Sequence, residues 1–328
     1  MGLEGTAHTF GAAVVEEEGK VLSNVRSVYS PVQGGLHPRE ASEHHAQCAS
    51  KTIEKSLEKA GVSIKEIGLV AFSQGPGLGP SLRVTATVAR ALSLFLKIPL
   101  IGVNHCIAHL EIGKLRTGAK DPVLLYASGA NTQIIAYARR RFRIFGETLD
   151  IGIGNMLDKF GRETGMPFPA GPLIEKEAKK GRYIELPYSI KGMDVSFSGL
   201  YTAAIQLFKK GIPLPDLCHS LQETAFAMLV EVSERAMAHT GKNELLLSGG
   251  VASNKRLREM CEKMAEERGG RCFVPEREFC VDNGAMIAWL GILMHKSGTR
   301  MRIEESKVDQ NFRTDYVEVT WLPEKEES

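Results

Sequence analysis

The sequence predicts a two-lobed α/β protein, and three observations support this fold class. First, 328 residues are enough for two domains of ordinary size. Second, a glycine-containing turn followed by further strands and helices occurs twice, at residues 5–9 and 129–132. Third, glycine-rich stretches follow apolar strands, where a backbone can approach a ligand closely. We therefore expect a duplicated α/β unit, with lobes at residues 1–121 and 122–328 and a central cleft.

The expected elements of the first half follow from short apolar runs separated by glycine turns. Ser42 is expected to cap the first helix, and Gly61 is expected to end it. Strands are predicted at residues 11–15, 21–29, 67–73 and 98–103, and helices at residues 42–60 and 81–96.

The second half repeats this pattern of strands before helices. Its first two strands flank the small-residue turn at residues 128–132. The last helix is expected to pack back toward the first lobe. Strands are predicted at residues 122–127, 133–138, 142–149, 245–247 and 271–275, and helices at residues 255–268 and 285–295.

Composition and charge narrow the functional classes. Apolar residues make up 43% and charged residues 24% of the chain, which is typical of a soluble globular protein and argues against disorder. The net charge of +2 gives no overall basic field, so an RNA substrate would need local basic clusters or partner subunits. Solvated turns would explain those clusters as well. They are Arg139, Arg140, Arg141 and Arg143, and Lys179, Lys180 and Arg182.

Cysteine usage and hydropathy predict a cytoplasmic protein. The six cysteines are scattered without a C-x-x-C pair, as expected in a reducing compartment. No apolar run approaches the ~20 residues needed to cross a bilayer. The N-terminus lacks the features of a signal peptide. We therefore expect no association with membranes.

His105 and His109 form the clearest candidate metal pair. Their i, i+4 spacing puts both imidazoles on one face of a helix. They follow the strand expected at residues 98–103, at the sheet edge where α/β proteins place ligands. Cys106 stands where a zinc protease of the H-E-x-x-H type has its glutamate, which disfavours that class. The alternative interpretation is two structural histidines in the core.

Asp282 is the best remote carboxylate to complete such a site. It follows a strand-like run and precedes the helix expected at residues 285–295, so it is also a candidate N-cap. Two imidazoles and an oxygen ligand suit iron and zinc about equally.

Three glycine-rich stretches favour a nucleotide site, at residues 5–11, 75–79 and 248–254. Helix N-termini next to such turns bind anions. Neither a Walker A motif nor a Rossmann fingerprint is present, and ordinary tight turns would explain each stretch alone. Asp150 and Asp158 lie beside glycines and suit ribose hydroxyls, whereas Glu175 could simply stabilise the first turn of a helix.

Together these motifs resemble the universal tRNA threonylcarbamoyladenosine synthase family, whose members were earlier described as O-sialoglycoprotein endopeptidases. The likeness covers essentially the whole chain and is to the archaeal and eukaryotic branch, the catalytic subunit of the KEOPS complex. The motifs are GTAHTFG at residues 5–11, SQGPG at 73–77, NHCIAH at 104–109, SGANT at 128–132, SGGV at 248–251 and DNG at 282–284.

The resemblance implies the actin-like ATPase (ASKHA) fold, with two ribonuclease-H-like lobes, and a set of site residues. One divalent metal, iron or zinc, is implied at His105, His109, Asp282 and Tyr126. Ala130 departs from the family pattern, which usually has a second glycine there. The implied adenine-nucleotide site comprises Tyr126, Ala127, Ser128, Gly129, Ala130, Asp158, Gly171, Glu175 and Asn254.

The implied activity is transfer of a threonylcarbamoyl group from threonylcarbamoyl-adenylate to the adenosine 3′ of the anticodon in tRNAs that read ANN codons, with release of AMP. The implied partners are tRNA and the KEOPS subunits, namely a small protein kinase, a dimerising subunit and a regulatory subunit. No general base is evident. Three alternatives stay open: a metalloprotease, a small-molecule kinase on the same fold and a non-catalytic nucleotide-binding scaffold.

Overall fold

The computed structural model describes residues 1–31 and 36–322. The chain divides into two compact units. The first comprises Met1–Arg116, Arg139–Phe142 and Val281–Ser328, and the second comprises Thr117–Ala138 and Arg143–Cys280. The C-terminal segment thus belongs with the N-terminal residues, whereas the expected lobes had one boundary after residue 121. Within the described ranges, no helix combines the length and the apolar character that a membrane span requires.

The first unit is built on a five-stranded sheet in the order β3-β2-β1-β4-β5. The first three strands pair antiparallel, and β4 and β5 continue the sheet in parallel. A parallel pair needs a crossover, and α2 (Gly79–Leu96) supplies it between β4 and β5. The strands are β1 (Gly2–Glu4), β2 (Thr9–Val15), β3 (Val21–Val28), β4 (Val70–Gly75) and β5 (Leu100–Asn104).

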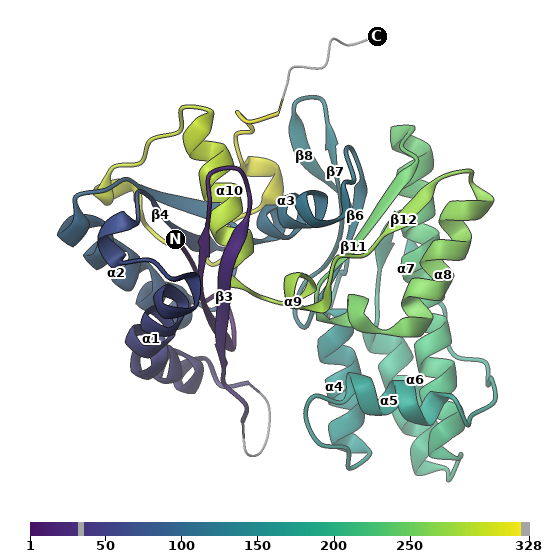
Figure 1. The fold of residues 1–328 in the computed structure, drawn as a ribbon. Coiled ribbons are helices and arrows are strands. Elements are labelled where there is room, and N and C mark those ends of the chain that lie inside the picture. Colours follow the sequence, from purple (N-terminus) through teal and green to yellow (C-terminus); the bar gives the residue numbers. More distant parts are fainter. Residues whose placement is uncertain (32–35, 323–328) are drawn as a thin grey trace. The chain divides into compact units, whose positions relative to one another are not determined.

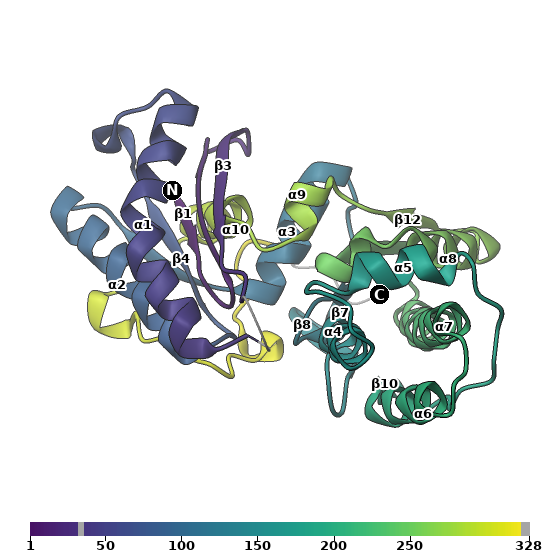
Figure 2. The same cartoon turned by 90° about the horizontal axis from the view of Figure 1, so that it is seen from below.

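Helices cover both faces of this sheet. α1 (Pro38–Ala60) packs on β2 and β3 and α2 packs on β4, while α10 (Gly284–Lys296) packs on β1, β2 and β4. Figure 2 shows the strands between α1 and α2 on one side and α10 on the other. Burial of both faces explains why Leu3, Phe10 and Phe72 are fully buried.

The end of α1 was predicted correctly from the sequence, and its start was not. Gly61 adopts a left-handed conformation, with φ of 69°, and ends the helix as predicted. The expected start at Ser42 is wrong, because the helix begins four residues earlier at Pro38. Proline is well suited to the first turn of a helix, since it has no N–H to leave unsatisfied.

A second sheet has the matching order, β8-β7-β6-β11-β12, and belongs to the second unit except for the first two residues of β8. β6 pairs antiparallel with β7 and parallel with β11, which in turn pairs parallel with β12. Arg139 and Arg140 make the tight turn from β7 to β8 with φ of 51° and 62°. The strands are β6 (Val123–Ala127), β7 (Thr132–Ala138), β8 (Arg141–Glu147), β11 (Glu244–Ser248) and β12 (Arg271–Phe273), and β9 (Ile190–Lys191) and β10 (Asp194–Val195) form a small separate sheet.

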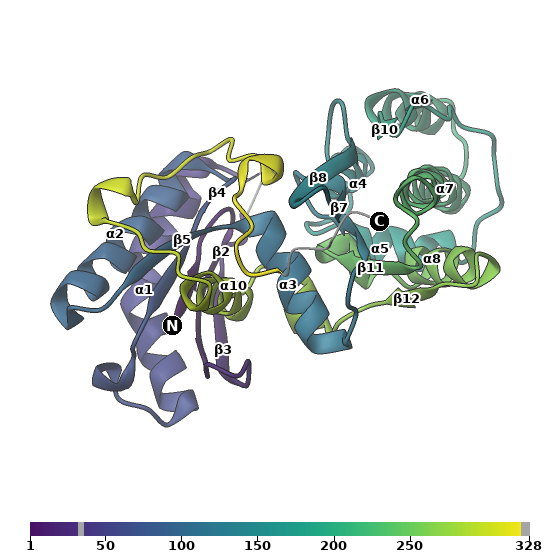
Figure 3. The same cartoon turned by 90° about the horizontal axis from the view of Figure 1, so that it is seen from above.

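α7 (Leu214–Thr240) is the central helix of the second unit. It packs on β6 and β7 and contacts α5, α6 and α8, and Figure 3 shows it between α6 and α8. The other helices are α4 (Ile153–Glu163), α5 (Gly171–Ala178), α6 (Ser198–Lys209), α8 (Lys255–Glu267) and α9 (Arg277–Cys280). Figure 1 labels these elements, together with α3 (His105–Thr117). Both units therefore have an antiparallel three-stranded part followed by two parallel strands, as a duplicated α/β unit requires.

Candidate metal centre and nucleotide-binding loops

The two histidines lie at the start of α3, directly after β5. Asn104 ends β5, and its Oδ1 accepts hydrogen bonds from the backbone N–H groups of Cys106 and Ile107 at 3.0 and 3.2 Å. This cap fixes the first turn of the helix. His105 and His109 then lie one turn apart with ring centroids separated by 4.8 Å, and both are buried.

Asp282 joins the histidines from the loop between α9 and α10. Its Oδ1 lies 3.4 Å from Nε2 of His105 and 3.5 Å from Nε2 of His109. Asp282 is not the cap of α10, because Asn283 Oδ1 accepts the N–H of Met286 at 3.0 Å instead. The carboxylate of Asp282 therefore does not cap the helix and faces the two histidines.

This set of donors fits a divalent metal. The three ligand atoms lie within 4.8 Å of one another. Ligand atoms about 2.0–2.1 Å from a tetrahedral ion are about 3.3–3.4 Å apart, close to the two distances found here. Two imidazoles and one carboxylate are also the ligands of many catalytic zinc and iron sites, which keep further positions open for substrate.

The electrostatics of the three residues also favour a cation. Burial alone would raise the pKa of Asp282, but its contacts with His105 and His109 hold that pKa well below its ordinary value. Burial, more than the opposing pull of Asp282, lowers the pKa of His109. A neutral imidazole beside a carboxylate is the state that binds a metal, and binding releases any proton held between them.

Glu4 was not identified from the sequence, yet its buried carboxylate reaches the same site. Its Oε2 lies 3.0 Å from Nδ1 of His105, and its side chain is inaccessible to solvent. The available signal was a lone acidic residue inside the apolar start of the chain, beside Leu3. Such a residue is costly to bury without a partner.

Tyr126, the fourth metal ligand implied by the resemblance, lies in β6 of the second unit and is buried. The structure brings together His105, His109 and Asp282 within the first unit. A role for Tyr126 stays a prediction.

The expected nucleotide residues after β6 form a tight turn. Ser128 Oγ donates to the carbonyl of Asn131 at 3.0 Å, and the N–H of Asn155 donates to the carbonyl of Gly129 at 2.8 Å. α4 begins against this turn, and a Cβ on Gly152 would lie 2.4 Å from the carbonyl oxygens of both Gly129 and Ala130. The absence of a side chain at Gly152 therefore lets the start of α4 lie directly against the turn formed by Ala127, Ser128, Gly129 and Ala130.

The remaining residues of the expected nucleotide site form hydrogen bonds around α5 and α8. Asp158 Oδ1 accepts the N–H of Ala170 at 2.8 Å, just before Gly171 starts α5. Glu175 Oε1 accepts the N–H of Lys255 at 3.0 Å, at the start of α8. That helix is capped by Asn254, whose Oδ1 accepts the N–H of Arg256 at 2.9 Å.

Asp150, one of the two aspartates expected near a ribose, binds backbone N–H groups at the start of α6. Its two carboxylate oxygens accept the N–H groups of Phe197 and Ser198, each at 2.9 Å, at the start of α6. Burial would raise the pKa of Asp150, but these backbone hydrogen bonds outweigh it and lower that pKa. Of the two aspartates, Asp158 is the one beside the loop that starts α5.

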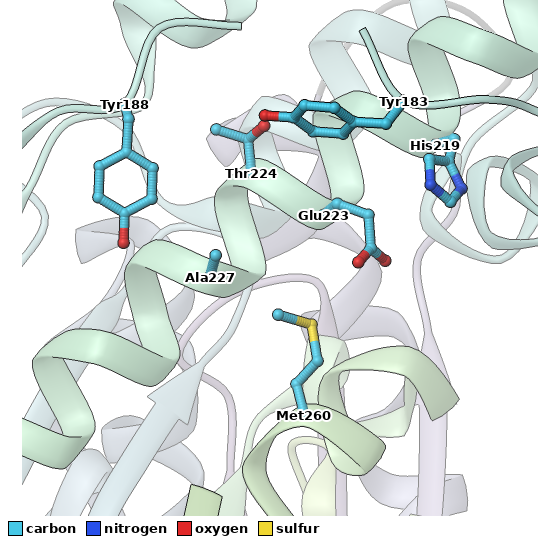
Figure 4. Close-up of a pocket in the computed structure, with 7 residues that line it drawn as sticks. All are labelled: Tyr183, Tyr188, His219, Glu223, Thr224, Ala227 and Met260. Carbon is cyan, nitrogen blue, oxygen red and sulfur yellow. The ribbon is translucent and has the colours of Figure 1, made fainter. Parts of the chain in front are cut away.

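A cavity of about 320 Å³ opens between α7, α8 and the segment that follows α5. Figure 4 shows Tyr188 on one side of it and His219 on the other, with Glu223 and Met260 pointing toward each other. The Glu223 carboxylate is held by the guanidinium of Arg256 at 2.7 Å. None of the metal or nucleotide residues predicted from the sequence lines this cavity.

The basic clusters are partly committed to local structure. Arg139 and Arg140 form the β7–β8 turn, and Lys180 pairs with Glu177 at 2.8 Å. Arg182 uses its backbone N–H to bind Asp216 at 2.7 Å, so its guanidinium is not engaged by that contact. A role in RNA binding stays a prediction for both clusters.

The family model for tRNA N6-adenosine threonylcarbamoyltransferase (TsaD) matches residues 20–289. A relative of that name from Thermococcus sibiricus is 58% identical over 323 residues, which is 98% of this chain and 99% of the relative. A probable bifunctional tRNA threonylcarbamoyladenosine biosynthesis protein from Methanocaldococcus jannaschii is 57% identical over 99% of this chain, but this chain spans only 60% of that relative.

Solved structures show the fold. HypF, in a phosphate- and nucleotide-bound form, matches with a TM-score of 0.61 at 13% identity, over 90% of this chain and 55% of HypF. Component A of (R)-2-hydroxyglutaryl-CoA dehydratase from Acidaminococcus fermentans matches with a TM-score of 0.56 at 12% identity, over 89% of this chain and 96% of that protein. These are actin-like ATPase folds, so the expected fold class is confirmed. The family model and the full-length relative together establish that this chain belongs to the tRNA N6-adenosine threonylcarbamoyltransferase family.

Proposed function

We propose that this chain transfers a threonylcarbamoyl group from threonylcarbamoyl-adenylate to N6 of the adenosine 3′ of the anticodon in tRNA. The observation that carries the proposal is the 58% identity to a threonylcarbamoyltransferase along 99% of that relative's length. The buried trio of His105, His109 and Asp282 supports it, because it offers a metal site beside helix α3.

The reaction is an acyl-type transfer. The exocyclic amine attacks the carbamoyl carbonyl carbon, a C–N bond forms and the C–O bond to the adenylate phosphate breaks. AMP leaves with the electron pair, and the amine loses one proton to solvent or to a base. The mixed anhydride is already activated, so accurate positioning supplies much of the rate.

The chain's own residues would bind and orient the two substrates. His105, His109, Asp282 and Tyr126 would hold one divalent metal, iron or zinc. When bound, that metal would supply Lewis acidity toward a phosphate or carbonyl oxygen. The loop at Ser128 and the starts of α4 and α8 would hold the adenylate, because helix N-termini favour phosphate.

The protease alternative lacks the glutamate that acts as general base in the H-E-x-x-H motif. Cys106 takes the place of the glutamate in H-E-x-x-H, and burial raises the pKa of its thiol to about 11. A neutral, fully buried thiol cannot activate water at neutral pH.

We further propose that the chain works in the cytoplasm with KEOPS-type partners, namely a kinase, a dimerising subunit and a regulatory subunit. The near-neutral charge of +2 supports this, since a tRNA-binding surface then needs basic residues from partners as well. The M. jannaschii relative, named as bifunctional, extends well beyond this chain, and its additional segment offers a starting point for finding such a partner.

The decisive experiment supplies the purified chain and partners with threonine, bicarbonate, ATP, an adenylate-forming enzyme and unmodified tRNA. Nucleoside analysis should find threonylcarbamoyladenosine only when this chain is present. A phosphorylated small molecule or a cleaved glycoprotein in place of the modified nucleoside would refute the proposal.

Replacement of His105 by alanine tests the metal site within that assay. We expect His105→Ala to lose bound metal and at least about 100-fold of the transfer rate, because the site then keeps only one of its two imidazole ligands. Circular dichroism should show that the fold persists. His239→Ala, at an exposed histidine, is the matched control and should keep both metal and activity. Full activity in a metal-free His105→Ala protein would exclude the assigned role.

A further inference from the structure

We propose that Glu4 is a positioning residue that keeps Nδ1 of His105 as a hydrogen-bond donor, so that Nε2 is the nitrogen offered to the metal. The inference rests on the metal site of the proposed function and adds a residue that does not touch the metal itself. It is carried by three contacts of the Glu4 side chain and by the position of its turn in the sheet.

Both oxygens of the Glu4 side chain lie within hydrogen-bond distance of polar groups. Oε2 lies 3.0 Å from Nδ1 of His105, while Oε1 accepts the backbone N–H of Thr6 at 2.7 Å and the Thr6 hydroxyl at 2.6 Å. The Thr6 hydroxyl oxygen also lies 3.3 Å from Nδ1. Because its proton points to Glu4, that oxygen can only accept from the imidazole. As a carboxylate, Glu4 also can only accept, so we infer that Nδ1, which lies between these two acceptors, carries hydrogen.

The opposite nitrogen faces the other candidate ligands. Nε2 of His105 lies 3.4 Å from Oδ1 of Asp282. A neutral imidazole has one N–H, so a hydrogen held at Nδ1 leaves a lone pair at Nε2. An acceptor then faces an acceptor unless a cation, either a proton or a metal ion, lies between them. Carboxylate-to-histidine contacts of this kind orient metal ligands and raise their basicity.

The turn that carries Glu4 is fixed by the sheet. Glu4 ends β1, which lies between β2 and β4, and the next residue, Gly5, donates its N–H to Ser73 Oγ at 3.0 Å. A Cβ on Gly5 would lie 1.9 Å from Thr85 Oγ1, so glycine lets the backbone lie directly against α2. The sheet thus brings together Glu4, at the end of β1, and His105, at the start of α3, although they are 101 residues apart.

Glu4→Gln tests the inference with almost no change of shape. The two donors of Thr6 would hold the amide oxygen, which turns the amide NH₂ group toward Nδ1. The imidazole would then move its hydrogen to Nε2 and lose the lone pair needed by the metal. We expect Zn²⁺ affinity, measured by competition with a chromophoric chelator, to fall about 10–100-fold. The Co²⁺ absorption spectrum should also change.

Ser73→Ala is the matched control, because it removes a buried hydrogen bond at the adjacent residue without touching Nδ1. It should bind Zn²⁺ within about twofold of the unchanged protein, with unfolding curves showing that both variants fold. Equal Zn²⁺ affinity of Glu4→Gln and Ser73→Ala would overturn the inference.

A second measurement needs no Glu4 variant to fold. ¹⁵N-histidine NMR of the metal-free protein at neutral pH, assigned by loss of the signal in His105→Gln, should show hydrogen at Nδ1 of His105. Hydrogen at Nε2 alone would disprove the positioning role. Neither measurement uses tRNA or the adenylate, so failure of the transfer assay and failure of this inference are separate results.

Discussion

His45 shows how a single buried residue should govern the acid stability of the first unit. It lies in α1, is inaccessible to solvent and meets the ring of Phe10 edge-on at 5.6 Å between centroids. Among the described residues, neither of its ring nitrogens has a hydrogen-bond partner. Burial, followed by the charges of His44 and His8, lowers the pKa of His45 from 6.5 to about 4.

We therefore predict a loss of stability in mild acid that depends on His45. Between pH of about 6.5 and about 4 the unfolded chain binds the proton and the native chain does not, so the free energy of unfolding is highest above this window and falls through it. The fall due to His45 should be on the order of 2–3 kcal/mol at most. Urea unfolding from pH 7 to pH 4.5, with EDTA present, measures it.

His45→Gln should flatten that pH dependence, because glutamine does not titrate. His239→Gln, at an exposed position, should leave the dependence unchanged. An identical acid-induced loss in His45→Gln and in the unchanged protein would assign the effect to other groups.

At the scale of elements, helix and strand interiors were easier to predict than helix ends. Gly61 ends α1 as expected, but Pro38 rather than Ser42 starts it, and Asn283 rather than Asp282 caps α10. When two adjacent residues can both cap a helix, the local sequence does not show which of them is the cap. The contacts of Asp282 with His105 and His109 decide between them.

The loop after β11 contains a position, Gly249, at which only glycine is expected to fit. Gly249 has φ of 94°, and a Cβ there would lie 2.2 Å from the carbonyl oxygen of Ala127, next to the expected nucleotide turn. Gly249→Ala should destabilise the protein by at least about 2 kcal/mol, because it combines backbone strain with a steric clash. Urea unfolding checks the stability, and calorimetric titration with AMP should show weaker binding.

Gly250→Ala is the matched control for this change. A Cβ on Gly250 meets nothing within 4 Å, so stability and AMP binding should change little. Equal stability of the two alanine variants would show that the close contact at Gly249 relaxes without cost.

At the scale of the whole molecule, the C-terminal segment completes the unit that begins the chain. Asn104, which caps the metal-bearing helix, donates from Nδ2 to the carbonyl of Phe312 at 3.0 Å. Gln74 donates to the carbonyl of Lys307 at 2.7 Å, and Trp321 Nε1 donates to Glu111 of α3 at 3.0 Å. The end of the chain thus supports the helix that carries His105 and His109.

Removal of residues 303–328 should therefore weaken metal binding as well as folding. Loss of these hydrogen bonds, at roughly 1 kcal/mol each, and of the accompanying packing should cost at least about 3 kcal/mol. Zn²⁺ affinity and thermal unfolding measure the two effects, and the full-length chain is the reference. Unchanged Zn²⁺ affinity after removal of residues 303–328 would show that α3 holds its position without them.

The sequence by itself determined the features that depend on residues close together in the chain and on the order of the strands. One helical turn separates His105 from His109, glycines mark tight turns, and the duplicated order of strands indicates the fold class. The tertiary structure decided which distant residues meet. The position of β1 at the centre of its sheet brings Glu4 to Nδ1 of His105. The packing of α10 on that sheet places Asp282, which precedes the helix, beside Nε2 of His105. Such contacts depend on strand order and burial across the whole unit, which no local spacing specifies.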